Sequence, residues 1–182
     1  MGPQIVVRLP APEADFQAGR LVTTRFLSEV ITSEAPDVND ALTECIILAT
    51  LGGRALSHRH QSLVETLYVN TSEDFWSRHR YIHTTLSRRL EALSSNYTCH
   101  SQHADPMLLF TCMMAQTTVL HLQKLIEEAW PAIDQSDAAV AESMRVSLVA
   151  AQEVVKLTKM LSQISFLKVA AFQPCLLSAF WY

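Results

Sequence analysis

Glycine placement is the feature that most restricts how this chain can fold. All four glycines lie at or before Gly53, so the chain from Arg54 to Tyr182 has none. Tight turns between antiparallel strands usually need a residue at positive φ, and glycine most often supplies it. A long glycine-free stretch with repeated apolar spacing therefore favours helices. We predict an all-α fold, an irregular multi-helix bundle with three long helices and several shorter ones.

Composition and charge narrow the class of protein. Apolar residues make up 49% of the 182 and charged residues 18%, which is typical of a globular domain. The 14 Lys and Arg against 18 Asp and Glu give a net charge of −4. Proteins that neutralise phosphates normally carry a basic surplus, so this chain alone is not expected to contact nucleic acid. We predict that residues 1–182 form one helical domain, incomplete at its C-terminal end.

Cysteine spacing and the N-terminal sequence bear on cofactors and location. Cys45, Cys99, Cys112 and Cys175 lack the paired spacing of zinc sites, so we expect free thiols in a reducing compartment. The N-terminus has no secretory signal pattern. The apolar run 169–182 is shorter than the roughly 20 residues that a membrane-spanning helix needs. We therefore predict no cofactor and no membrane association.

Short elements are expected before the glycine-free stretch. The prolines in residues 1–22 favour extended or irregular chain, and a short helix is expected around Thr24 to Ile31. Another helix should begin near Asn39 or Asp40, either of which can cap it. Gly52 and Gly53 either end this helix or allow a close helix crossing.

Three long helices are expected in the glycine-free stretch. One begins after Asn70, the next is started by Asp105 and Pro106, and the last runs from Asp137 to Leu167. Apolar spacing predicts their buried faces, with the first helix turning a polar face to solvent. The predicted apolar face of the first helix consists of Phe75, His79, Ile82, Leu86, Leu90 and Leu93, and its polar side of Arg78, Arg88, Arg89 and Glu91. The predicted buried residues of the second helix are Met107, Phe110, Met114, Leu120 and Leu125. Those of the third helix are Met144, Leu148, Val155 and Ile164.

Two groups of residues could carry chemistry. His79 and His83 share a helix face, and a metal would need a third ligand from His58, His60, His100 or His103. Because His79 lies on the apolar stripe and no Glu separates the pair, we predict a structural role instead. The basic clusters could form an anion-binding surface, although a solvated helix face is favoured. These clusters are Arg54, His58, Arg59 and His60, and Arg78, Arg80, Arg88 and Arg89.

No catalytic motif is present, since the chain has neither a phosphate-binding loop nor a nucleophile elbow. We predict that the protein is not an enzyme and has no catalytic, cofactor-binding or metal-binding residues. The methionines are most simply core residues, but they could line an adaptable groove for a ligand or partner. These are Met107, Met113, Met114, Met144 and Met160.

Five segments in order resemble the fungal-specific transcription factor domain, the helical middle region of binuclear-zinc-cluster regulators. The most specific is the run Asp74–Arg80 continued by Leu86–Leu93. The other four are Arg8–Pro10 with Asp15–Gly19, Leu51–Leu56, Asp105–Pro106 and Phe172–Phe180. The family's six-cysteine zinc cluster is not found in this sequence, and the family domain usually continues beyond the last segment.

The resemblance implies a regulatory domain in the nucleus, with the cytoplasm as a second location. It would act through the transcription machinery or other regulatory proteins, a small hydrophobic effector, or a homodimer. The alternative is a stand-alone helical module that binds a hydrophobic ligand or a partner helix. A helical enzyme with a histidine metal site is the third and least favoured hypothesis.

Overall fold

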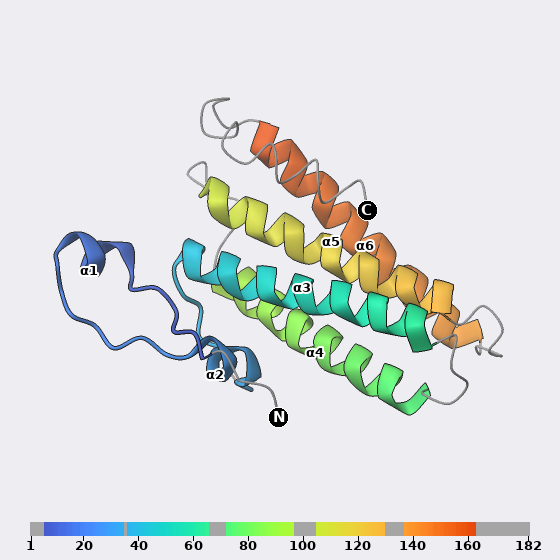
Figure 1. Cartoon of the computed structure of the whole chain (residues 1–182). Coiled ribbons are helices and arrows are strands. Elements are labelled where there is room, and N and C mark those ends of the chain that lie inside the picture. The colour runs from blue at the N-terminus through green and yellow to red at the C-terminus, as the bar shows by residue number, and fades with distance from the viewer. Residues whose placement is uncertain (1–5, 35, 66–71, 97–104, 130–136, 163–182) are drawn as a thin grey trace.

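The computed structural model describes residues 6–34, 36–65, 72–96, 105–129 and 137–162 (Figure 1). Two short helices, α1 (Glu13–Gln17) and α2 (Leu27–Thr32), precede four long ones. The long helices are α3 (Ala41–Glu65), α4 (Ser72–Asn96), α5 (Pro106–Ala129) and α6 (Asp137–Ser162). The described residues contain no sheet, only an isolated antiparallel bridge between Arg8 and Phe26. The predicted all-α class is confirmed.

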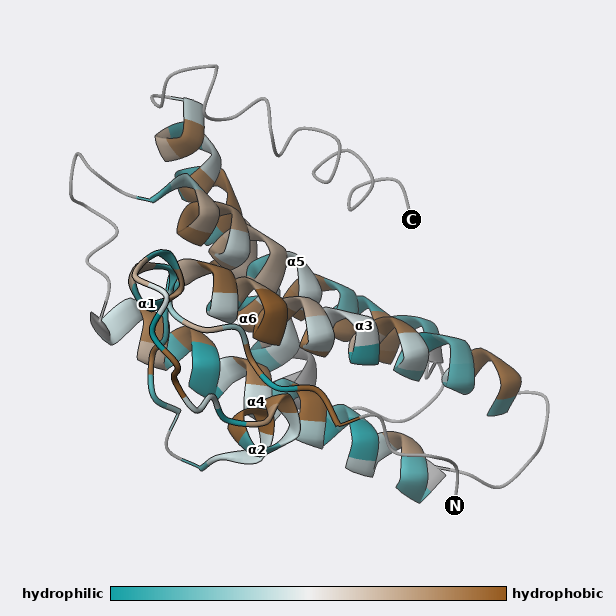
Figure 2. Ribbon diagram, turned by 60° about the vertical axis from the view of Figure 1, so that its left-hand side comes forward, coloured by the Kyte–Doolittle hydropathy of each residue, from teal (hydrophilic) through white to brown (hydrophobic). Residues whose placement is uncertain are grey.

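The long helices pack in a definite order. In Figure 1, α3 and α5 lie in the middle, α4 lies beneath them and α6 lies above. The main contacts join α3 to α4 and α5, α4 to α5, and α5 to α6. Apolar and polar residues alternate along each long helix (Figure 2), as amphipathic helices require. The fully buried core includes Ile47, Leu48, Leu51, Leu86, Leu93, Leu109, Ala115 and Leu122.

The N-terminal segment adds a loop to this bundle. Its base is closed by main-chain hydrogen bonds from Leu9 to Arg25, at 3.0 Å, and from Leu27 to Val7, at 2.9 Å. Leu9 is buried in the core, whereas α1 lies at the far end of the loop, away from the long helices (Figure 1). The sequence predicted irregular chain up to residue 22, so the short helix α1 was not predicted.

Two predicted helix caps are confirmed. Asp40 Oδ1 accepts a hydrogen bond from the main-chain N–H of Thr43 at 3.1 Å, just before α3. Asp105 Oδ1 accepts one from the N–H of Met107 at 2.9 Å, just before α5. These bonds satisfy main-chain donors that have no partner within their helices. The predicted final turn of α6, from residue 163 to Leu167, and the segment around Pro174 lie outside the described residues.

Helix α3 is longer than the sequence indicated, which makes four long helices rather than three. It passes through Gly52 and Gly53 and ends at Glu65. A Cβ atom on Gly52 would lie 3.4 Å from Thr118 Oγ1 of α5, whereas one on Gly53 would meet nothing within 4 Å. Of the two alternatives for this pair, the close crossing is the one observed, and it involves Gly52.

The apolar faces of α5 and α6 are also displaced from those predicted. Of the five residues predicted for α5, only Leu125 is buried, while the others are partly exposed. On α6, Ala150, Leu157 and Leu161 are buried, whereas Met144, Leu148 and Val155 are exposed. Helix α6 carries apolar residues on two faces, and periodicity alone does not distinguish the face that packs on α5. No described helix combines the length and apolar character needed to cross a membrane.

Replacing each glycine of α3 with alanine should separate helix propensity from packing. Gly53→Ala should raise the free energy of unfolding by about 0.5–1 kcal/mol, because alanine costs less backbone entropy in a helix and its methyl group has space. Gly52→Ala should give a smaller gain or a loss, because its methyl group touches Thr118. Urea unfolding of both variants measures this, and a larger gain in Gly52→Ala than in Gly53→Ala would contradict the prediction.

Candidate functional site

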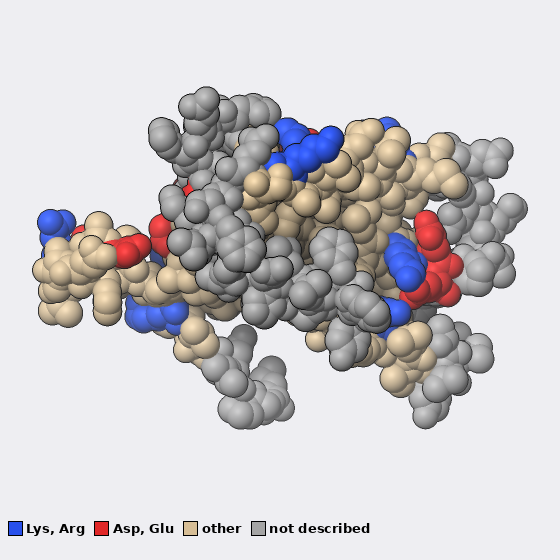
Figure 3. Space-filling model, turned by 90° about the horizontal axis from the view of Figure 1, so that it is seen from above, with Lys and Arg blue, Asp and Glu red and all other residues tan. Residues whose placement is uncertain are grey.

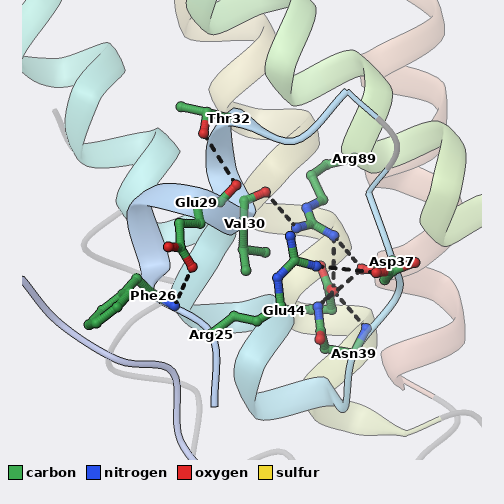
Figure 4. A network of polar contacts seen from close by, with 9 residues as sticks. All are labelled: Arg25, Phe26, Glu29, Val30, Thr32, Asp37, Asn39, Glu44 and Arg89. Atoms are coloured by element: carbon green, nitrogen blue, oxygen red, sulfur yellow. Dashed lines mark hydrogen bonds and ion pairs between the residues drawn. The ribbon is translucent and has the colours of Figure 1, made fainter. Parts of the chain in front are cut away.

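A buried ion pair lies where α2, α3 and α4 meet (Figure 4). The side chains of Arg89, from α4, and Glu44, from α3, are 2% and 0% exposed, and Arg89 Nη1 lies 3.4 Å from Glu44 Oε1. Arg89 also donates hydrogen bonds to two main-chain carbonyls, from Nη1 to Asp37 at 2.7 Å and from Nη2 to Val30 at 3.2 Å. One side chain of α4 therefore holds α2 and the connection that leads into α3.

Glu44 completes this network from the first turn of α3, where the helix dipole favours a carboxylate. Its Oε1 accepts hydrogen bonds from the main-chain N–H and the side-chain Nδ2 of Asn39, both at 2.9 Å. Its Oε2 is buried without a hydrogen-bond partner among the described residues. Burial lowers the pKa of Arg89, while the charge of Glu44 opposes that change. An arginine pKa starts so high that the guanidinium stays charged and the pair persists.

The network corrects one prediction from the sequence. Arg89 was placed on the polar side of its helix, but it is among the largest fully buried side chains of the protein. Its neighbour Arg88 is exposed, as predicted. A charge can be buried in this way only when paired and hydrogen-bonded, and Arg89 finds its partners on two other elements. The arrangement suits a structural clamp, since the guanidinium pairs with Glu44 and donates to the carbonyls of Val30 and Asp37.

A second buried cluster joins α3 to α4 through histidine and aromatic rings. His58 of α3 lies with its ring centroid 4.7 Å from that of Phe75 and 5.7 Å from that of His79, both on α4. His83 stacks on the outer side of His79, with ring centroids 6.3 Å apart. His58 and His79 are buried, as predicted for His79. Sequence spacing could place His79 beside His83, but it could not bring in His58 from another helix.

The surroundings of His58 and His79 lower the pKa of both rings and so favour their neutral forms. Burial, together with the nearby His58 and His83, lowers the pKa of His79 to about 4. Burial and the positive charge of Arg78 also lower the pKa of His58, while Glu65 opposes them. His58 Nε2 and His79 Nδ1 have no hydrogen-bond partner among the described residues. Protonating either ring would place a charge in an apolar contact between two helices, which is costly.

The described residues offer little support for a metal or anion site. They contain no group of three or more His, Cys, Asp or Glu side chains placed to hold a metal ion. His100 and His103 lie outside the described residues. Several members of the basic clusters already have partners within the chain: Arg59 pairs with Glu128 at 3.5 Å, Arg78 pairs with Glu65, and the buried Arg89 pairs with Glu44. Cys45 and Cys112 are free thiols, as predicted, and the other two cysteines are outside the described range.

Comparison with known proteins identifies relatives of the chain. It is 48% identical over 166 residues to the pigment biosynthesis transcriptional activator pigB of Monascus ruber. It is 40% identical over 173 residues to the citrinin biosynthesis transcriptional activator mrl3, also of Monascus ruber. These matches cover 91% and 94% of this chain. The chain is a homologue of fungal transcription regulators.

This homology confirms the predicted family resemblance. The azaphilone cluster-specific transcription factor azaR of Aspergillus niger is another such regulator, 37% identical over 91% of this chain. The chain spans about a third of the length of the curated relatives that it matches. No family model matches the chain. No solved structure matches it either.

Arg89→Ala should show whether the buried ion pair holds the fold of this regulator homologue. The change leaves Glu44 charged, buried and unpaired, so the free energy of unfolding should fall by about 3–5 kcal/mol. The neighbouring exposed Arg88→Ala is the control, and it should change stability by less than about 0.5 kcal/mol. Urea unfolding followed by circular dichroism measures both. Equal effects of the two substitutions would contradict the role of the network.

The histidine cluster should make the protein less stable in acid. The folded-state pKa of His79 is about 4, below its ordinary 6.5, so the folded protein binds fewer protons between these values. The stabilisation is therefore complete above pH 6.5 and is lost as the pH falls towards 4. Between pH 7 and pH 5, His79 should account for a loss of about 2 kcal/mol.

Urea unfolding at pH 7 and pH 5 tests this contribution by comparing variants. His79→Phe removes the titrating ring but keeps an aromatic side chain, so the loss of stability in acid should shrink. The control is His60→Gln on the exposed side of α3, and it should lose as much stability as the original protein. If His79→Phe loses just as much, the acid sensitivity comes from other groups.

Proposed function

We propose that this chain is a regulatory domain of a fungal transcription factor that does not itself contact DNA. The observation that carries the proposal is the 48% identity to part of the activator pigB over 91% of the chain. The relatives are named as regulators of biosynthetic pathways, so control of such a pathway is the role that we propose here. The nucleus is the expected location.

The chemistry of the chain supports a regulatory role over DNA binding or catalysis. Its net charge is −4, and the arginines of the described basic clusters include several that are engaged with carboxylates. Regulation would then proceed through protein partners or a small effector, rather than through phosphate contacts. The absence of a recognisable catalytic motif in the sequence agrees with the names of the relatives, and we propose that the chain is not an enzyme.

A second candidate function is a stand-alone helical module that binds a hydrophobic ligand or a partner helix. The specific observation in its favour is the second apolar face of α6, which is exposed in the described structure. The two candidate functions predict different experimental results. A regulatory domain changes transcription when it is brought to a promoter, whereas a stand-alone module binds its ligand without that consequence.

Fusion to an unrelated DNA-binding domain tests the regulatory role. The fusion should change expression of a reporter gene several-fold relative to the DNA-binding domain alone. Arg89→Ala in the fusion should weaken the effect because it destabilises the fold, and Arg88→Ala should preserve it. A folded fusion that reaches the nucleus and leaves the reporter unchanged would count against regulation. Binding of the unfused chain to DNA in a gel-shift assay would contradict the expected lack of DNA contact.

A further inference from the structure

The side of α6 away from the core carries an exposed apolar stripe. The opposite side, with Leu157 and Leu161, is buried, and the main contact of α6 is with α5. On the outer side, Met144, Leu148 and Val155 are 65%, 60% and 53% exposed. Figure 3 shows the molecule from above, and the described residues that are visible in it are mostly uncharged, with a few small groups of charges.

The spacing of this stripe is that of a coiled-coil seam. Successive positions lie three and four residues apart along α6, and this alternation keeps them on one side of the helix. The members, here called the α6 seam, are Ala141, Met144, Leu148, Ala151, Val155 and Thr158. Thr158 marks the end of the seam that borders α5, because its Oγ1 lies 3.5 Å from Met113 Sδ of that helix. A seam with this repeat fits the apolar side of one other helix, because knobs from one helix enter holes on the other.

One long edge of the α6 seam faces away from α5 and is here called the open edge. The charges along this edge indicate which kind of helix can bind to the seam. Each residue that precedes a seam position is uncharged. Of these residues, Ala150 and Leu157 are buried, and Ser143 donates a hydrogen bond to Gln123 of α5. The residues that follow the seam positions are Glu142, Arg145, Val149, Gln152, Lys156 and Lys159, three basic and one acidic. Glu142 is paired with Arg145, whose Nε and Nη2 lie 2.8 and 2.7 Å from its two oxygens. Lys156 Nζ lies 3.4 Å from Glu153 Oε2, one turn earlier on the same side of α6. With Glu153 included, three basic residues stand against two acidic ones, so the open edge keeps a small positive surplus on a chain that is acidic overall.

The basic residues of the open edge disfavour binding of a second copy of the chain at the α6 seam. Two α6 seams packed antiparallel about Gln152 would place Arg145 of one copy opposite Lys159 of the other. Like charges at the flanking positions of a coiled coil oppose pairing, whereas carboxylates there would favour it. A helix with an apolar repeat flanked by acidic residues satisfies both the seam and its edge.

We propose that the α6 seam binds an amphipathic helix of a partner protein, with Glu or Asp beside the partner's apolar repeat. This inference rests on the proposed regulatory function and names the chemistry of the partner. The apolar repeat supplies contact area, and the basic edge sets the orientation and the choice of partner.

Two 26-residue helical peptides, equal in length to α6, serve as probes. Both carry the same leucine repeat with three-four spacing, and they differ only in Glu or Lys at the flanking positions. Fluorescence anisotropy measures their binding to the full chain. The Glu peptide should bind at least about tenfold more tightly than the Lys peptide, even though the chain has a net negative charge. Equal binding of the two peptides, or no binding of either, would overturn the proposal.

Two substitutions of the same type locate the binding surface. Val155→Glu on α6 should reduce binding of the Glu peptide by about tenfold or more, because it places a charge in the seam. Val64→Glu on α3 is the matched control: Val64 is 56% exposed, close to the 53% of Val155, and lies outside the seam. Equal losses of binding would overturn the assignment to α6. Circular dichroism confirms that each variant is folded.

Reversing the charges of the open edge tests the acidic preference without touching the apolar seam. The double change Lys156→Glu with Lys159→Glu should make the Lys peptide the tighter ligand. An unchanged preference would overturn the charge argument. Analytical sedimentation of the chain tests whether two copies pair through the α6 seam. A dimer that Val155→Glu dissociates and Val64→Glu leaves intact would assign the seam to self-association and overturn the proposal.

The reporter fusion keeps this inference distinct from the proposed function. If the fusion regulates the reporter and Val155→Glu has no effect on either regulation or peptide binding, the seam is not the docking surface while the regulatory role stands. If the Glu peptide binds at the seam and the fusion leaves the reporter unchanged, docking stands and the regulatory role fails.

Discussion

The position of the N-terminal part of the chain depends on the guanidinium of Arg89. It binds the carbonyls of Val30 and Asp37 and pairs with Glu44, so three successive parts of the chain are fixed to α4 by one side chain. Buried ion pairs are weak sources of net stability, but the loss of one partner is expensive. The network therefore matters less for how stable the fold is than for which arrangement of α2 and α3 it accepts.

The sequence contained part of this information. Phe75, His79, Ile82 and Leu86 alternate by four and three residues, and the same alternation continues through residue 89 to Leu93. The position of Arg89 on the buried stripe was thus available from spacing, but its charge favoured the polar side. Only the tertiary structure supplies the carboxylate and carbonyls that compensate burial. Those partners lie 45 to 59 residues away along the chain.

The same division applies elsewhere in the fold and the site. Caps at Asp40 and Asp105 are local, so the sequence predicted both helix starts. The contact of His58 with His79 and the approach of Gly52 to α5 are tertiary, and no local pattern reveals them. Helix α6 is the clearest case, because two apolar faces give two valid solutions to the same periodicity. Packing on α5 decides between them.

The two sides of the bundle therefore differ in the contacts that they make. The α3–α4 side holds the charged and aromatic contacts that fix the chain to itself, while α6 packs mainly on α5 and leaves an apolar seam open. A ligand that binds only the folded state stabilises it by mass action. A helix bound at the seam would stabilise the helical form of α6, because the seam residues line up only when α6 is helical. This coupling between partner binding and the folded state of α6 is the physical basis on which a partner could regulate this domain.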